Sequence, residues 1–249
     1  MRIIYDNLVE DATITSYSEH PQMTWEDALL DTRLSRLGRT IGVDDEWIKF
    51  SFTSAVSASY CLIYNHNITA SATVTIQGNA TDVWTSPSLE ETLTIDDVCY
   101  ADWTSASYQY WRLYIDDPTN TDEYIQLSKV VLGPSLQMPS FSNVFECPRL
   151  TNSSATKSPS GQLYGDKRIT YDAPAGFTFD NVSEANRLLI NAWFNEIHNV
   201  KPFSLIVWEN DLDIQLPVWV NCINEKINWQ KNKGQGVRWN MELGFEECF

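Results

Sequence analysis

Short segments with a two-residue hydrophobic period constrain this chain most. Apolar and polar side chains alternate over residues 47–52 and 108–115, and turn-forming residues follow the strand-like segments, as at 78–79 and 116–120. Successive side chains of a β-strand point to opposite faces, so this period indicates strands that each bury one face. Ten Trp, eleven Tyr and ten Phe support this interpretation, because aromatic residues favour strands. We therefore predict a mainly β protein.

The length and the charge distribution indicate two domains. The chain has 249 residues, 43% of them hydrophobic, which is enough for two modest cores. Gly and Pro interrupt the strand pattern at 133–139, and the charge balance changes there. Residues 1–139 hold 20 acidic and 7 basic side chains, whereas residues 140–249 hold 13 acidic and 10 basic ones. We expect one domain over 1–139 and another over 140–249.

The first half reads as a series of short strands. Trp47 or its neighbours should face inward, and 67–70 should form a short helical turn. The expected strands are 3–5, 13–16, 47–52, 60–64, 73–77, 91–95, 108–115 and 124–132.

The second half mixes strands with one helix. Ser183 is typical of a helix N-cap, and Leu189, Trp193 and Ile197 recur at intervals of four, as in an amphipathic helix. Residues 151–161 are rich in Ser, Thr, Asn, Pro and Gly and cannot build a core, so we expect a loop or arm. The expected strands are 162–173, 176–179, 203–209, 216–225 and 236–245.

Several segments of the first half carry a family resemblance. They are RLSRLGRT at 33–40, HNI at 66–68, YWR at 110–112 and VLG at 131–133. Residues 25–135 thereby resemble the discoidin-like (F5/8 type C) galactose-binding-like domains. This resemblance implies a jelly-roll-type β-sandwich that binds sugars, lipid heads or proteins through loops at one end and rarely catalyses a reaction.

About 90 residues of the second half carry another resemblance. Its segments are SGQ at 160–162, YG at 164–165, PFSL at 202–205, Trp208, Pro217, Cys222, Trp229 and WNMELGFEE at 239–247. They resemble the distal minor tail proteins of long-tailed bacteriophages. The resemblance implies a tail-tube-like β-sandwich with one flanking α-helix that assembles into a ring continuing the tail tube. The arm at 151–161 and the whole first domain are extra to the short family form.

Our first hypothesis is therefore a structural protein of a phage tail tip or baseplate. It would form part of a homo-oligomeric ring at the distal end of the tail tube, and the N-terminal sandwich would project outward. Its partners would be tube, tape-measure, hub or fibre proteins, and it would be assembled in the host cytoplasm and located in the virion. We expect contacts with neighbouring copies at four residues of the arm: Thr151, Ser154, Lys157 and Ser160.

The alternative hypothesis is a carbohydrate-binding protein that recognises a host glycan. We expect Trp84 and Trp103 to lie in polar loops, where an exposed indole suits stacking on the apolar CH face of a sugar. Both could instead cap the sandwich or lie in a subunit contact. Arg39 and Arg36 could serve a sugar site or an inter-subunit ion pair. The acidic surface argues against binding to anionic lipopolysaccharide cores unless cations bridge the two.

Other function classes find little support. Nothing selects a catalytic acid pair or nucleophile, so we expect no enzyme and no cofactor; a glycan-degrading enzyme is the weakest hypothesis. The net charge of −16 and the absence of a basic stripe argue against stable nucleic-acid binding. No apolar run could span a bilayer, acidic residues interrupt the first segment, and we expect neither membrane insertion nor a signal peptide. Five Cys without C-x-x-C spacing should be reduced thiols.

Metal binding is also weighed against simpler interpretations. His20, His66 and His198 are far apart and lack ligand spacing, so we expect no metal at them. The acidic segments 116–123 and 209–213 hold possible Ca²⁺ ligands, but polar turns are the favoured interpretation.

Overall fold

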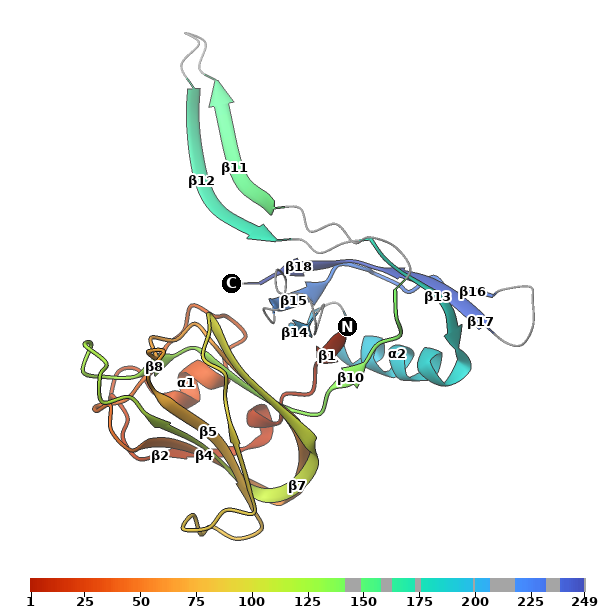
Figure 1. The fold of residues 1–249 in the computed structure, drawn as a ribbon. Helices are drawn as coiled ribbons and strands as arrows, with labels where there is room; N and C mark the ends of the chain where they lie inside the picture. The colour runs from red at the N-terminus through yellow and green to blue at the C-terminus, as the bar shows by residue number, and fades with distance from the viewer. Residues whose placement is uncertain are drawn as a thin grey trace. The chain divides into compact units, whose positions relative to one another are not determined.

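A computed structural model describes residues 1–141, 149–157, 163–172, 176–198, 200–206, 218–231 and 238–248 (Figure 1). The chain is mainly β, with antiparallel sheets and an α-helix beside the strands of its second half, which confirms the predicted fold class. Contacts divide it into two compact units. Of the described residues, unit 1 comprises 1–137 and 203–206, and unit 2 comprises the others. The chain thus returns to unit 1 after the helix, while the boundary between 139 and 140 stays a prediction.

A sheet built on two long strands dominates unit 1. Its order is β2-β4-β7-β5-β6, and β9 also pairs with β4. The bounds are β2 Thr13–Ser16, β4 Glu46–Tyr64, β5 Thr73–Asn79, β6 Leu89–Thr92, β7 Val98–Asp116 and β9 Lys129–Gly133. The strands expected at 47–52 and 60–64 are one strand, β4, which pairs with β2 near its start and with β9 near its end. Register irregularities after Ser51 and Ala58 mark bulges where long strands bend.

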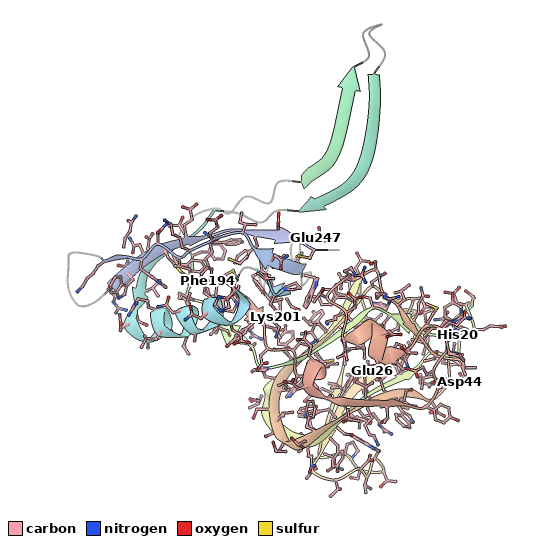
Figure 2. The ribbon with its side chains drawn as sticks, turned by 180° about the vertical axis from the view of Figure 1, so that it is seen from behind. His20, Glu26, Asp44, Phe194, Lys201 and Glu247 are labelled. Atoms are coloured by element: carbon pink, nitrogen blue, oxygen red, sulfur yellow. The ribbon has the colours of Figure 1, made fainter. Side chains whose placement is uncertain are left out.

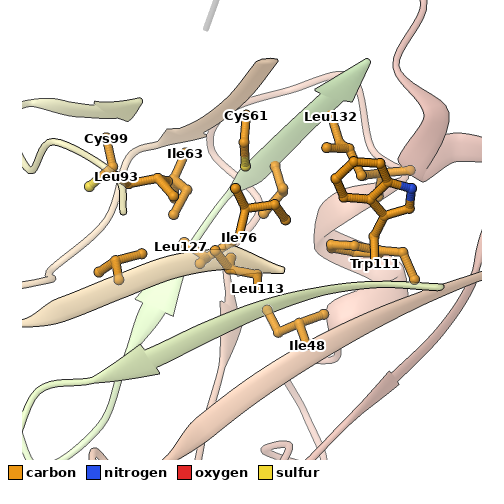
Figure 3. Close-up of a cluster of buried hydrophobic side chains, with 14 of the residues drawn as sticks. Ile48, Cys61, Ile63, Ile76, Leu93, Cys99, Trp111, Leu113, Leu127 and Leu132 are labelled. Carbon is orange, nitrogen blue, oxygen red and sulfur yellow. The ribbon is translucent and has the colours of Figure 1, made fainter. Parts of the chain in front are cut away.

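The alternation in β4 and β7 decides which side chains form the core of unit 1 (Figure 3). Ile48, Phe50, Trp111 and Leu113 are at most 1% exposed, whereas Trp47 lies on the opposite face of the sheet. Its neighbour Ile48 therefore faces inward in its place. Each fully buried aliphatic or aromatic side chain contributes about 1.5–3 kcal/mol.

Cysteines add small side chains to these cores. Cys61 and Cys99 are buried in unit 1 and Cys222 in unit 2, all as free thiols, and Cys248 is a partly exposed free thiol. Burial raises the pKa of Cys99 to about 12 and that of Cys222 to about 11. Cys147 lies outside the described residues.

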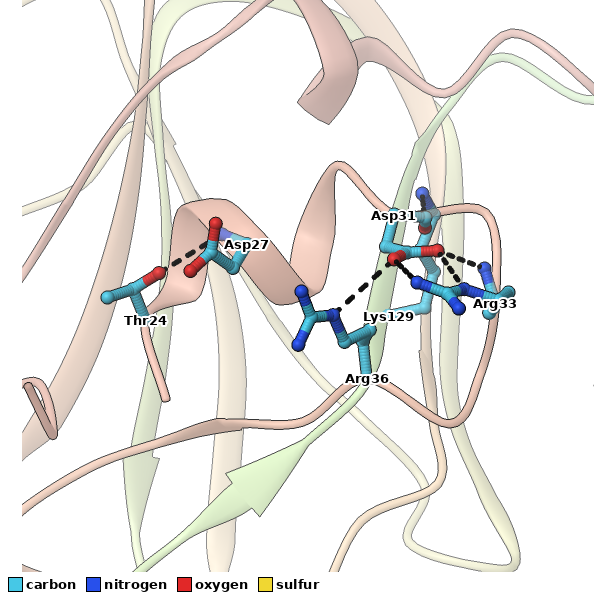
Figure 4. A network of polar contacts seen from close by, with 6 residues as sticks. All are labelled: Thr24, Asp27, Asp31, Arg33, Arg36 and Lys129. Atoms are coloured by element: carbon cyan, nitrogen blue, oxygen red, sulfur yellow. Dashed lines mark hydrogen bonds and ion pairs between the residues drawn. The ribbon is translucent and has the colours of Figure 1, made fainter. Parts of the chain in front are cut away.

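Two short helices close one end of unit 1, while the helical turn expected at 67–70 is wrong. That segment is irregular because its polar groups are used in bonds to other loops, such as Asn67 to Tyr124. Instead, η1 spans Leu8–Asp11 and α1 spans Trp25–Leu29, with Thr24 as N-cap of α1. Beyond α1, the Asp31 carboxylate pairs with Arg33 at 2.7 Å and with Arg36 at 3.6 Å (Figure 4). The Arg33 guanidinium holds the pKa of Asp31 far below its usual value.

Small strands complete unit 1. β3 (Gly38–Arg39) pairs with β8 (Gln126–Leu127), and β1 (Arg2–Ile4) pairs with β10 (Leu136–Gln137) and β14 (Phe203–Ile206). The buried Asn7 amide fastens the segment after β1 to β9: Oδ1 accepts from the Leu132 N–H and Nδ2 donates to the Val130 carbonyl, both at 3.1 Å.

Unit 2 packs a helix on a sheet. The sheet order is β13 (Phe177–Ser183), β17 (Arg238–Leu243) and β16 (Gln230–Lys231), and β15 (Val218–Cys222) pairs with β18 (Phe245–Glu247). The helix α2 spans Glu184–Ile197, with Ser183 as N-cap as predicted. Its buried face holds Ile190, Trp193 and Ile197. Leu189, expected in this face, is 53% exposed, because the line of residues packed against the sheet runs through 190, 193 and 197. Figure 2 shows Phe194 on this helix and Lys201 after it.

A two-stranded hairpin stands where a loop is expected. β11 (Arg149–Lys157) pairs with β12 (Leu163–Asp172) as a sheet of their own, so the loop prediction is wrong for 151–157. Pairing satisfies the backbone groups that the two strands turn toward each other, and a hairpin needs no apolar core to do so. Thr151, Ser154 and Lys157 lie on β11, and Ser160 lies outside the described residues.

Candidate functional site

The three residues predicted to bind a sugar lie in three different places. Trp84 lies in the loop between β5 and β6, Trp103 in β7, and Arg39 in β3. Each makes a separate ring contact, respectively with Arg112, Trp111 and Tyr124. The structure therefore does not gather them into one site, and each is considered by itself.

Trp103 is part of a strand, and the prediction of a loop is wrong here. Its ring packs against the fully buried Trp111, with 5.8 Å between centroids, and its Nε1–H donates to the Ala58 carbonyl at 3.0 Å. The side chain therefore caps the core, which is the alternative that the sequence left open.

Arg39 makes structural contacts within unit 1. Its guanidinium carbon lies 3.4 Å from the centroid of the Tyr124 ring, and its backbone N–H donates to Met23. Arg36, weighed beside it, pairs with Asp31 within the chain. These contacts place Arg39 in β3, beside His20, and Arg36 in the loop after α1.

Trp84 occupies a different environment, on the face of the sheet that points away from the core. The Arg112 guanidinium carbon lies 4.6 Å from its ring centroid. The indole Nε1–H donates to Asp82 at 2.8 Å, and Asp82 in turn accepts from Lys49 at 2.6 Å. The Lys49 ammonium and the indole N–H lower the pKa of Asp82, in that order. Trp84 is thus a partly exposed ring in a fixed orientation.

Further aromatic rings lie on the same face, and the strand alternation puts them there. We call Tyr17, Trp47, Trp84 and Tyr114 the aromatic face. Trp47 pairs in register with Tyr114, and the Tyr17 and Trp47 centroids are 6.3 Å apart. Tyr17 is 64% exposed and the other three are partly exposed. A row of rings on one face of a sheet offers apolar stacking surfaces to a ligand.

Polar side chains lie between these rings. Arg112 Nε donates to the Gln77 amide oxygen at 2.7 Å, and Gln77 Nε2 donates to Glu90 at 2.6 Å. Tyr114 donates a short hydrogen bond to Asp45, and that bond raises the pKa of the phenol to about 12. The face therefore presents donors and acceptors beside its aromatic surfaces.

The sequence reasoning missed Tyr17, Trp47, Arg112 and Tyr114 as candidates. A usable signal was present for three of them. Trp47 precedes the inward Ile48, and Arg112 and Tyr114 alternate with the inward Trp111 and Leu113. Residues that alternate with the inward-facing ones along a strand lie on the opposite face of the sheet. Selecting those residues would have identified the aromatic face.

A hollow lies between the loop after β4 and the loop before β7. It has a volume of about 560 Å³ and is lined by Asn65, His66, Ile68, Ala70, Ile95, Asp96 and Asp97. His66 Nδ1 accepts from the Ile68 N–H at 3.2 Å, so its Nε2 carries the proton and faces the Asp96 carbonyl at 3.0 Å. His66 thereby connects the two loops, as a hydrogen-bonding residue rather than a ligand.

This arrangement predicts a pH effect on stability. Burial lowers the pKa of His66, so the unfolded chain binds its proton more readily than the folded chain. The neutral form is stabilising above the unfolded pKa of about 6.5, and that contribution is lost as the pH falls below it. We expect the melting temperature of wild-type protein to fall between pH 7.5 and 5.5 by more than that of His66→Gln. His20→Gln is the control, and equal pH dependence in all three proteins would contradict this role.

The acidic turn after β7 is organised by its own carboxylate. The buried Asp117 accepts from the Thr69 N–H at 2.9 Å and from the Asn120 amide at 3.0 Å.

Within the described ranges, no group of three or more potential metal-ligating side chains occurs. The segment 209–213 lies outside those ranges. No helix of the described parts is long and apolar enough to cross a bilayer.

Comparisons with known proteins point to several solved structures. No family model matches the chain, and no curated protein matches it either. Chitosan-binding module 1 of a Paenibacillus sp. IK-5 chitosanase/glucanase is 18% identical over 51% of this chain and 98% of the module, with a TM-score of 0.40. A CBM32 module from Clostridium perfringens, solved with GalNAc-β-1,3-galactose, is 12% identical over 51% of this chain and 99% of its own, with a TM-score of 0.41. The lectin domain of lectinolysin, solved with Lewis b antigen, is 12% identical over 53% and 98%, with a TM-score of 0.43.

Proposed function

We propose that unit 1 recognises a glycan, such as one on a host surface, through its aromatic face. The observation that carries this proposal is the row of partly exposed rings with polar side chains fixed between them. A pyranose ring has an apolar CH face and polar edges, so it needs a stacking surface and adjacent hydrogen-bonding groups together. Trp84 with Arg112 and Asp82 offers this combination.

The proposed role is binding alone. A hydrolase would require two carboxyl groups facing a scissile bond or a nucleophile with a base. The carboxylates beside Trp84 are occupied: Asp82 by Lys49 and the indole N–H, and Glu90 by Gln77. We therefore propose a recognition protein that is not an enzyme.

A glycan array probed with the full chain tests this proposal. The intact protein is needed because unit 1 is not one continuous segment. Its strand β14, which pairs with β1, comes from residues 203–206, whereas the rest of unit 1 ends at residue 137. We expect binding that Trp84→Ala abolishes and Trp103→Ala preserves. The absence of binding to every glycan would leave this proposal without support.

We further propose that unit 2 assembles copies of the chain into a ring at the distal end of a bacteriophage tail. The hairpin β11–β12 supports this second role, since a lone two-stranded hairpin is marginally stable in water and gains from a partner surface. Residues 149–172 hold four basic and two acidic side chains in a chain of net charge −16, so the hairpin suits the acidic surface of another copy. Tube, tape-measure, hub or fibre proteins would be the other partners, in the virion.

Charge reversal in the hairpin should therefore weaken self-association. We expect the wild-type protein to form an oligomer in light scattering after gel filtration, and the double variant Lys157→Glu, Lys167→Glu to dissociate at least about tenfold more readily because two attractive charges become repulsive. Lys226→Glu, an exposed change in unit 2 outside the hairpin, is the control. A wild-type protein that stays monomeric at high concentration, or a control that dissociates equally, would refute the assembly role.

A further inference from the structure

We propose that the aromatic face selects glycans that carry a carboxylate, and that Arg112 binds that group. This inference rests on the proposed glycan recognition and adds the ligand class, such as a uronic-acid or sialic-acid residue. The argument concerns the charge of Arg112, its neighbours and the geometry that holds it.

Among the described residues, Arg112 lacks the carboxylate partner that several other arginines have. Four others are ion-paired: Arg2 with Asp102, Arg33 and Arg36 with Asp31, and Arg187 with Glu184. Arg112 uses Nε to donate to the neutral Gln77 amide at 2.7 Å, and one face of its guanidinium lies on Trp84. No ion pair or further hydrogen bond joins its terminal nitrogens to the described residues. In an acid-rich chain, this leaves two coplanar donors for a ligand.

The neighbouring carboxylates, Asp82 and Glu90, make their hydrogen bonds to other groups and not to the terminal nitrogens of Arg112. Asp82 is bound to Lys49 at 2.6 Å and to the Trp84 indole at 2.8 Å, and Glu90 accepts from Gln77 at 2.6 Å. The two cations and two anions of this cluster balance locally. Charges farther away than about 8 Å are largely screened at physiological salt. The net charge of −16, from which the sequence predicts repulsion of anionic glycans, therefore acts weakly here.

Burial and rigidity both favour an anion at Arg112. Burial lowers the pKa of its guanidinium, which means that desolvation penalises the cation, and the charges of Glu90 and Asp82 offset this penalty only in part. A carboxylate that accepts from both terminal nitrogens compensates this charge with matching planar geometry. Gln77, Trp84 and Tyr114, whose ring centroid lies 5.7 Å from the guanidinium carbon, fix its orientation, so little side-chain freedom is lost on binding. A neutral diol could accept from the same nitrogens, but its hydrogen bonds would lack the added strength that a charged acceptor gives.

The test uses an array of acidic oligosaccharides, each printed beside its carboxyl-reduced counterpart, and the full chain. We expect wild-type protein to bind acidic members at least about tenfold more tightly than their reduced forms, as for a charged bidentate hydrogen bond. Arg112→Gln should lose this preference. Arg112→Lys, which keeps the charge and loses the fork, should fall between the two. Arg36→Gln removes the same charge at an exposed, Asp31-paired position and should bind as wild type.

Each outcome has a distinct meaning once melting curves show that the variants are folded. Equal wild-type binding to acidic and reduced glycans, or equal losses in Arg36→Gln and Arg112→Gln, would overturn the inference. Binding to neutral glycans that depends on Trp84 but not on Arg112 would overturn the inference and leave glycan recognition standing. Binding to none would overturn both.

Discussion

Replacing Gly133 by alanine should lower the free energy of unfolding of unit 1 by about 3 kcal/mol, at the upper end of what overpacking costs. A Cβ at this position would lie 2.2 Å from the backbone oxygen of Asp6, so one of two paired backbone segments must move. Gly133 ends β9, where it pairs with Tyr60, and the Asn7 amide is bonded to the same strand. A shift of Asp6 would therefore also strain the Asn7 hydrogen bonds, each worth about 1 kcal/mol.

Thermal unfolding measures this effect. For a chain of this size, 1 kcal/mol corresponds to about 2–4 °C in Tm, so Gly133→Ala should melt roughly 6–12 °C below wild type. Gly42→Ala is the matched control, because its Cβ would meet only a side-chain oxygen of Glu46 at 3.0 Å. We expect a much smaller change there. A Gly133→Ala protein with the same Tm as wild type would show that the segment after β1 can shift with little loss in the free energy of unfolding.

The role of Gly133 illustrates what the sequence can and cannot show. The sequence identifies this glycine as the end of a strand and as punctuation near a boundary, because Gly and Pro disrupt strand patterns. It does not show which distant backbone approaches the missing Cβ, here that of Asp6, 127 positions away in the segment after β1 and brought close only by the tertiary fold. Period-two segments predicted most strands of unit 1 for the same local reason. Their joining into the 19-residue strands β4 and β7 depends on partners that local patterns do not specify.

The second unit shows the same division between local and distant causes. Ser183 and the helical period predicted α2 correctly, since capping and amphipathicity are local properties. The helical period was compatible with either Leu189 or Ile190 in the buried face. Packing against the sheet buries 190, 193 and 197 and leaves Leu189 exposed. The strand β11 was missed because its polar composition is typical of loops, whereas strand pairing depends on backbone bonds; its partner β12 lies within the predicted strand 162–173.

Of the three residues that the sequence predicted for the site, only Trp84 lies on the aromatic face. Trp84 and Trp103 have similar polar flanks, but Trp103 belongs to β7 and covers Trp111. A flanking sequence says nothing about which side of a sheet a ring occupies. Trp84 contacts Arg112 of β7 and Asp82 of its own loop, and these two are bonded in turn to Gln77 of β5 and Lys49 of β4. The aromatic face therefore emerges only when these strands are paired.

These two tryptophans should respond in opposite ways when replaced by alanine. Trp84→Ala should weaken glycan binding about 30-fold or more, since a stacking ring contributes about 2 kcal/mol by comparison with base–aromatic stacking. Its Tm should change little, because Trp84 lies outside the core on the outer side of the sheet. Trp103→Ala should leave the affinity unchanged and lower the stability of unit 1 by about 2 kcal/mol, because it removes packing on Trp111 and the hydrogen bond to Ala58.

Titration of each variant with a glycan identified on the array, alongside melting curves, checks both expectations. Trp84→Phe is a useful intermediate: it keeps an aromatic face but loses the N–H that binds Asp82. It should retain most of the affinity if stacking dominates, and little if the indole is needed to position Asp82. A loss of affinity in Trp103→Ala equal to that in Trp84→Ala, in folded protein, would place the binding surface elsewhere than on the outer face, since the two rings share no described contact and act on different sides of β7.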